Sequence, residues 1–121
     1  MAEGVRRLAF WAPLALCTWL ALTPGPPAAV AEVSDVVLHL LAFAYLAFAL
    51  SLAHFSNRWM MTLVCLLIYG AALELLQSTV STRSAELKDL GMDLAGILVG
   101  LGLYRAIGGA IYAFTERMFG R

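Results

Sequence analysis

The chain has 121 residues, of which 62% are hydrophobic and only 13% are charged. A soluble domain carries about 45–50% apolar and about 25% charged residues, so this composition indicates a membrane protein. Eight basic and eight acidic residues give a net charge of zero, which excludes a basic surface for nucleic acid. We therefore expect membrane lipids as partners.

The apolar residues are gathered into four runs: Leu8–Leu22, Val36–Ala53, Trp59–Val80 and Leu90–Tyr104. A membrane-spanning helix needs about 20 largely apolar residues, and the two shorter runs can be extended at their ends. Backbone polar groups in lipid must be satisfied within the segment, and the alternation typical of a barrel strand is absent. The sequence predicts an all-α integral membrane four-helix bundle with short loops. Its helices cover approximately residues 8–23, 36–53, 59–80 and 90–106, and an amphipathic cytoplasmic tail covers 107–121.

The first run has two interpretations. Arg6-Arg7, the apolar run and the small residues Ala29-Val30-Ala31 together resemble a secretory signal peptide. The cleavage point would lie nine residues beyond the apolar run, which is long, so a retained first helix is favoured and cleavage stays the alternative.

Basic residues in loops and tails predict the orientation. The side that holds both termini and the loop at 54–58 carries six: Arg6, Arg7, Arg58, Arg105, Arg117 and Arg121. The opposite side carries two, Arg83 and Lys88. Both termini are therefore expected in the cytoplasm. The cytoplasmic halves of the helices contain no acidic residue and are expected to hold no buried charge pair.

Polar side chains gather at the opposite ends of the helices. Ionisable groups are costly in hydrocarbon and rarely occur there without partners or a task. Spacings of three or four residues place pairs of them on one helix face, and the predicted topology brings all of them into the outer leaflet. The expected binding cluster consists of Asp35, His39, Glu74, Gln77, Arg83, Asp89 and Asp93.

The members of this cluster have structural interpretations as well. Asp89 suits the N-cap of the last helix, whereas Asp93 is one turn deeper and needs a partner, for which Arg83 is the candidate. His39 and Glu74 could form structural hydrogen bonds. As functional groups, they and Asp93 are the candidates for catalysis.

Small residues mark the last helix as a packing surface. Gly96-x-x-x-Gly100 gives it a smooth face for close contact with another helix. Packing within the bundle is the default use, and self-association through these glycines is the alternative. Cys17 and Cys65 lie in apolar runs without a metal-binding spacing and are interpreted as buried thiols.

From Ser34 onward the chain resembles the VanZ-like family of bacterial membrane proteins. The resemblance rests on three segments: Ser34-Asp35-x-x-x-His39-x-x-x-Phe43, Gly70-x-x-x-Glu74-Leu75-Leu76-Gln77, and Arg83-x-x-x-x-x-Asp89-Leu90-x-x-Asp93-x-x-Gly96-x-x-x-Gly100. The family usually has Lys where Val36 stands and commonly Asn where Asp93 stands. The resemblance implies a multi-pass protein of the bacterial inner membrane and cell envelope. The family's founding member is linked to teicoplanin resistance without an agreed activity.

Three classes of function fit these residues. A binding or translocation element for an envelope lipid headgroup or small solute ranks first. A hydrolase-like membrane enzyme with His39 as base and Glu74 or Asp93 as acid ranks second. The same groups suit zinc or manganese. Against an enzyme, no short metal-ligand motif is present and four helices leave little room for a lipid substrate. A purely structural polar network ranks third. Whether the chain is an enzyme, and which cofactor it uses, stays open at this point.

Overall fold

The computed structural model describes residues 1–22, 35–77, 79 and 87–120. Its helices are α1 (Ala2–Leu22), α3 (Asp35–Ala53), α4 (Trp59–Gln77), α5 (Leu87–Leu103), the π-helical segment η1 (Tyr104–Gly108) and α6 (Gly109–Phe119). No strand occurs among the described residues. The predicted all-α fold is confirmed.

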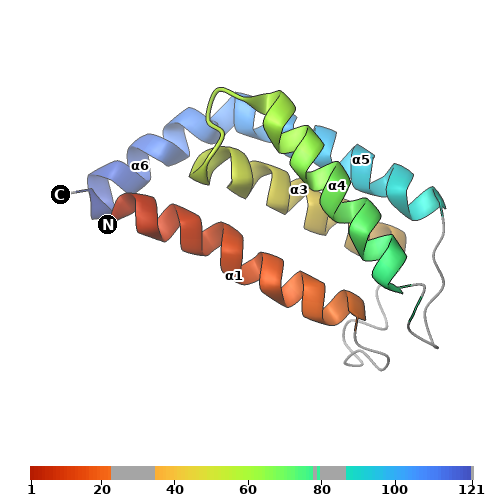
Figure 1. Ribbon diagram of the computed structural model, residues 1–121. Helices are drawn as coiled ribbons and strands as arrows, with labels where there is room; N and C mark the ends of the chain where they lie inside the picture. Colours follow the sequence, from red (N-terminus) through yellow and green to blue (C-terminus); the bar gives the residue numbers. More distant parts are fainter. Residues whose placement is uncertain (23–34, 78, 80–86, 121) are drawn as a thin grey trace.

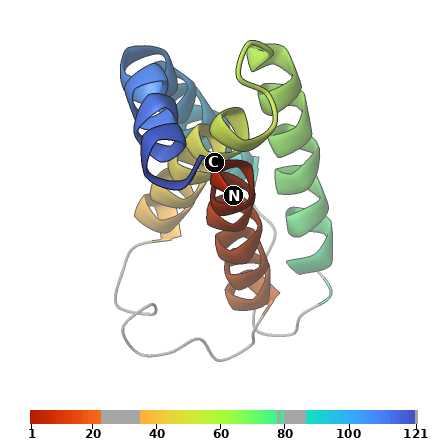
Figure 2. The same cartoon turned by 90° about the vertical axis from the view of Figure 1, so that its left-hand side faces the viewer.

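The helices α1, α3, α4 and α5 run alongside one another, and both chain termini lie at the same end (Figure 1). Viewed from that end, the N-terminus of α1 and the C-terminus of α6 lie together (Figure 2). The most extensive contact between any two elements joins α3 to α5, followed by that between α1 and α3. The helix α3 is therefore the element around which the others pack.

Three helices are long and apolar enough to cross a membrane, namely Ala2–Leu22, Trp59–Leu76 and Leu90–Phe119, while Val37–Ala53 is apolar but shorter. Their outward faces carry large apolar side chains, such as Leu16, Leu41 and Ile68, that are 56–65% exposed. Exposed apolar surface on this scale is unfavourable in water and favourable against lipid. The architecture is that of a membrane protein.

Some helix boundaries differ from the expected ones. The first helix begins at Ala2 instead of residue 8, and the third ends at Gln77 instead of residue 80. The expected separate tail is instead helical in continuation of α5, through η1 into α6. The irregularity is a π-turn in which the Tyr104 ring lies over Gly108, where an added Cβ would overlap the ring carbons.

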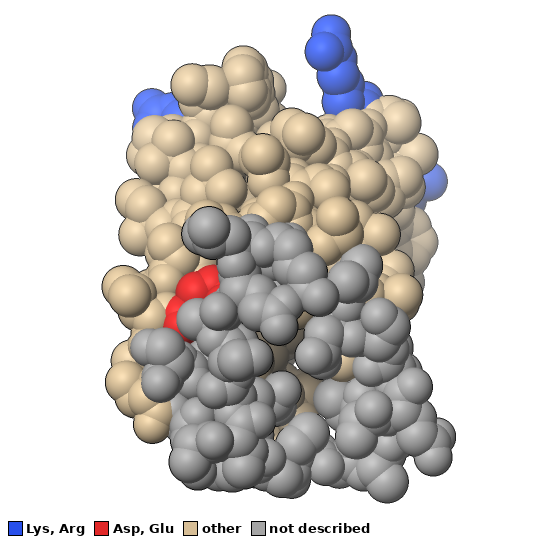
Figure 3. All heavy atoms as spheres, turned by 90° about the vertical axis from the view of Figure 1, so that its right-hand side faces the viewer, with Lys and Arg blue, Asp and Glu red and all other residues tan. Residues whose placement is uncertain are grey.

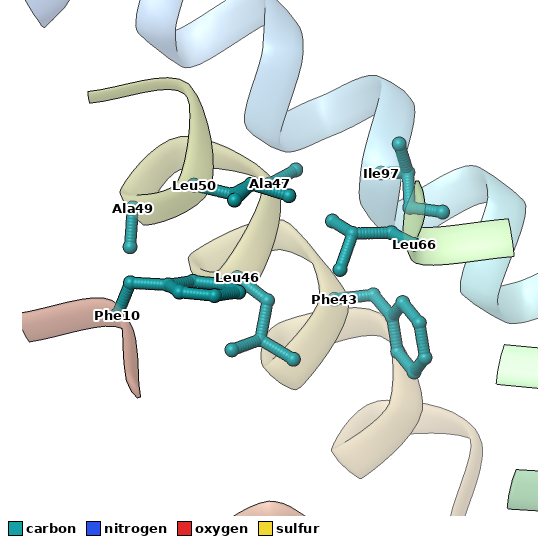
Figure 4. Packing of buried hydrophobic residues seen from close by; sticks show 8 residues of the cluster. All are labelled: Phe10, Phe43, Leu46, Ala47, Ala49, Leu50, Leu66 and Ile97. Atoms are coloured by element: carbon teal, nitrogen blue, oxygen red, sulfur yellow. The ribbon is translucent and has the colours of Figure 1, made fainter. Parts of the chain in front are cut away.

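The core lies where α3 meets its neighbours (Figure 4). Leu46 and Ala47 of α3 and Ile97 of α5 are fully buried, at 0% exposure. The helix α1 takes part as well, because Phe10 is only 3% exposed and the Tyr45 hydroxyl donates to the Ala9 carbonyl at 2.5 Å. The first helix is thus a packed member of the bundle.

The termini are joined by an arginine that sequence reasoning misplaced. Arg6 is 5% exposed and donates to Thr115 Oγ1 and to Glu116 Oε1, both at 2.9 Å, and its guanidinium lies 4.1 Å from the centre of the Tyr112 ring. The arginine is buried but its anionic partner is not, since the Glu116 side chain is 45% exposed. The partner Glu116 was assigned to a separate tail, whereas the continuous last helix brings it to α1.

The two glycines of the Gly96-x-x-x-Gly100 motif face α3 within the same chain. A Cβ on Gly96 would lie 2.6 Å from the Leu40 carbonyl oxygen, and one on Gly100 would lie closer still to the Ala44 carbonyl oxygen. Both approaches are shorter than real Cβ atoms tolerate, and the obstacle is backbone. Only glycine permits this approach of α5 to α3, which is the packing use of the motif.

We expect Gly100→Ala to lower the free energy of unfolding by about 1–3 kcal/mol, because the added methyl group forces the helices apart. Gly102→Ala is the matched control. Gly102 lies on the same helix, and a Cβ added there would have no neighbouring atom within 4 Å, so alanine at this position should be neutral or stabilising by up to about 1 kcal/mol. Denaturation with SDS in mixed micelles measures both. Equal stability of the two variants would contradict the close α3–α5 contact.

Candidate functional site

The polar site is centred on a contact between α3 and α5. His39 Nδ1 lies 2.5 Å from Asp93 Oδ1, and the side chains are 19% and 1% exposed, respectively. An ionised carboxylate only accepts, so Nδ1–H of His39 is the donor in the state where Asp93 is ionised. Asp93 was expected to need a partner, and His39 is one. The predicted contact with Arg83 stays a prediction, because Arg83 lies outside the described residues.

Glu74 of α4 brings a second carboxylate to the same place. One ligand atom from each of His39, Glu74 and Asp93 can be chosen such that all three lie within 4.8 Å of one another. Asp93 is buried and the other two are partly buried. The site therefore combines one imidazole and two carboxylates from three different apolar helices. All three catalytic candidates of the sequence analysis are brought together.

Two neighbours fix the shape of the site, and both belong to the segments that carry the family resemblance. The Phe43 ring lies parallel to the His39 ring, with an interplanar angle of 5° and centroids 6.4 Å apart. Gly70 faces Asp93, where an added Cβ would lie 2.8 Å from Oδ2. A larger residue at position 70 would push against the carboxylate. Their part in the site could not be recognised from the sequence without knowing which helix faces touch.

This end of the molecule is seen in Figure 3. Acidic atoms reach the surface there beside the residues drawn in grey, and the Lys and Arg atoms seen in this view lie toward its other edges.

The other predicted members of the cluster are not placed at the site. Asp35 is the first residue of α3 and Gln77 is the last residue of α4, but their side chains lie outside the part of the chain that the structure describes, as does the whole of Arg83. Asp89 is in the first turn of α5, which starts at Leu87, and its side chain also lies outside the described part of the chain, so its role as an N-cap stays a prediction.

A chain of contacts leads from the site toward an apolar cavity. Phe43 contacts the Tyr69 ring, with centroids 5.9 Å apart, and the Tyr69 hydroxyl lies 2.6 Å from Thr18 Oγ1. Because Thr18 donates its own proton to the Leu14 carbonyl, Tyr69 is the donor in this bond. Tyr69 also borders a cavity of about 320 Å³, whose other lining residues are Phe10, Trp11, Leu14, Leu50, His54, Phe55, Cys65 and Leu66.

The sequence model of the VanZ/LLP1 family matches residues 7–108. The chain belongs to the VanZ/LLP1 family. This match covers most of the chain and includes His39, Glu74 and Asp93, together with the helices that hold them. No curated protein and no solved structure matches the chain.

The contact between His39 and Asp93 makes a testable contribution to stability. Asp93→Ala removes the acceptor and leaves a half-buried N–H without it, so we expect a loss of roughly 1–3 kcal/mol in unfolding free energy. Asp93→Asn keeps an acceptor oxygen of nearly the same shape and should lose clearly less. Denaturation of the two purified variants in parallel makes the comparison, and equal losses would speak against the bond.

Proposed function

We propose that this VanZ/LLP1 membrane protein binds a polar headgroup of an envelope lipid, or a small solute, at the cluster of His39, Glu74 and Asp93. The observation that carries the proposal is the meeting of three ionisable side chains from three apolar helices. Placing ionisable groups in hydrocarbon is energetically unfavourable, so their presence there supports a functional role. The proposed location is the bacterial inner membrane.

The proposed orientation places both termini in the cytoplasm and the cluster in the outer leaflet. Its support is the excess of basic residues on the side of the termini. A reporter that works only in the cytoplasm should be active when fused after Arg121, and one that works only in the periplasm should be inactive. Activity of the periplasmic reporter would contradict the orientation and the placement of the cluster in the outer leaflet.

The chemistry of the site narrows the ligand. Carboxylates only accept hydrogen bonds and carry negative charge, so ionised Glu74 and Asp93 favour a ligand that donates, such as an ammonium group or several hydroxyl groups. The apolar cavity beside Tyr69 supports a ligand with a hydrocarbon part, because its volume of about 320 Å³ is within the range of ligand pockets. A lipid with an amine or sugar headgroup combines both features.

A hydrolase-like enzyme is the second candidate, and one observation favours it. His39 is held through Nδ1 by a buried carboxylate, which is how many general bases are oriented. In this candidate His39 activates water and Glu74 supplies the proton for the leaving group. The binding protein and the hydrolase can be told apart by the fate of the lipid, because a binding protein releases it unchanged whereas a hydrolase cleaves it.

The test uses the full chain purified in detergent and offered equal amounts of phosphatidylethanolamine and phosphatidylglycerol. Native mass spectrometry should show retention of the lipid with the ammonium headgroup. Glu74→Gln removes the charge without changing the shape and should lower that retention roughly tenfold, about 1.4 kcal/mol. A lipid fragment that accumulates with time would favour the enzyme instead.

Glu3→Gln is the control, since Glu3 is an exposed carboxylate on α1, on the side of the termini. Equal retention by the wild-type chain and by Glu74→Gln would refute headgroup binding at this cluster. In cells, deletion of the gene should change sensitivity to teicoplanin, and Glu74→Gln should fail to restore it where Glu3→Gln succeeds. Restoration by both variants would refute a link between the cluster and glycopeptide resistance.

A further inference from the structure

The side chains of the polar site carry the kinds of donor atom that bind divalent metal ions in proteins. One imidazole nitrogen and two carboxylate oxygens, from His39, Glu74 and Asp93, can be chosen within 4.8 Å of one another. Imidazole with carboxylates suits first-row divalent ions such as Zn²⁺ and Mn²⁺. We infer that these three side chains form a divalent metal site between α3, α4 and α5.

The charges support this inference. Asp93 is 1% exposed, and Glu74 lies beside it on the neighbouring helix. Two ionised carboxylates at this separation repel each other, and the repulsion is stronger in apolar surroundings than in water. A divalent cation balances both charges while imidazole remains neutral, so the occupied site has no net charge in the bundle.

The geometry requires only a small adjustment. Metal–ligand bonds of about 2.0–2.2 Å around a tetrahedral ion place neighbouring ligand atoms about 3.3–3.5 Å apart. His39 Nδ1 and Asp93 Oδ1 are 2.5 Å apart, so they would separate by about 1 Å and give up the proton they share. Glu74, which is only partly buried, closes the site from the third side.

Three protein ligands leave at least one coordination position open. Structural zinc sites are closed by four protein ligands, whereas sites that act on a ligand keep a position for water or substrate. A bound metal would also change which ligand groups the site prefers. The carboxylates alone attract hydrogen-bond donors, whereas a bound cation attracts electron-pair donors such as phosphate oxygens. The inference concerns the same residues as the proposed function and does not depend on it.

The first experiment measures metal content. The full chain is purified without a polyhistidine tag, stripped with chelator, exposed to Zn²⁺ or Mn²⁺ and desalted. We expect about one ion per chain, and roughly a tenfold or greater loss of affinity in His39→Gln and Glu74→Gln. The matched controls are His54→Gln, at an exposed position directly after α3, and Glu3→Gln, and both should retain the ion.

The second experiment does not depend on removing a ligand. The chain has two histidines, so His54→Gln leaves His39 as the one remaining imidazole. Pulsed electron paramagnetic resonance of Mn²⁺ bound to this variant should show coupling to an imidazole nitrogen. A wild-type chain that binds no metal, a loss of metal in His54→Gln, or Mn²⁺ without nitrogen coupling would each overturn the inference.

Lipid retention by the stripped and the metal-loaded chain separates the two proposals. If the chain binds no metal but still retains lipid in a way that depends on Glu74, the proposed function holds and the metal site is refuted. Stoichiometric metal with no lipid retained in either state would support the metal site and refute headgroup binding.

Discussion

The close approach of α5 to α3 is the constraint on which the polar site depends. Gly96 and Gly100 bring the backbone of α5 against the Leu40 and Ala44 carbonyls of α3, and no side chain could occupy that space. The same register sets Asp93, one turn before Gly96 on α5, opposite His39, one residue before Leu40 on α3. Backbone packing in the middle of the bundle and polar contact at its end are therefore parts of one interface.

The polar site is stabilised by its neighbours as well as by its own bond. Gly70 leaves room for the Asp93 carboxylate on the side of α4, and the ring of Phe43 lies parallel to the imidazole. At the other end of the bundle, Arg6 joins α1 to α6 through Thr115 and Glu116. The two ends thus differ in kind. One has an arginine that donates to Thr115 and Glu116, and the other has two carboxylates and an imidazole that suit a cationic ligand.

The sequence was sufficient for the helices and for the end at which the acids gather, because apolar run lengths and residue spacing are local properties. It also identified His39, Glu74 and Asp93 as the central residues. It did not predict the contact between His39 and Asp93, because the rotation of each helix about its axis decides which faces meet. Arg6 was misplaced because its partner Glu116 lies 110 residues away, beyond the reach of any local pattern.

The central claim is that α3 and α5 hold His39 against Asp93 within one chain of this VanZ/LLP1 protein. A double-mutant cycle on unfolding free energy, with His39→Ala, Asp93→Ala and the double variant, tests it most directly. Residues in contact show a coupling of about 0.5–3 kcal/mol, whereas separate residues are additive within about 0.3–0.5 kcal/mol. We predict a favourable coupling of about 1 kcal/mol or more. Additive effects of the two substitutions would contradict the claim.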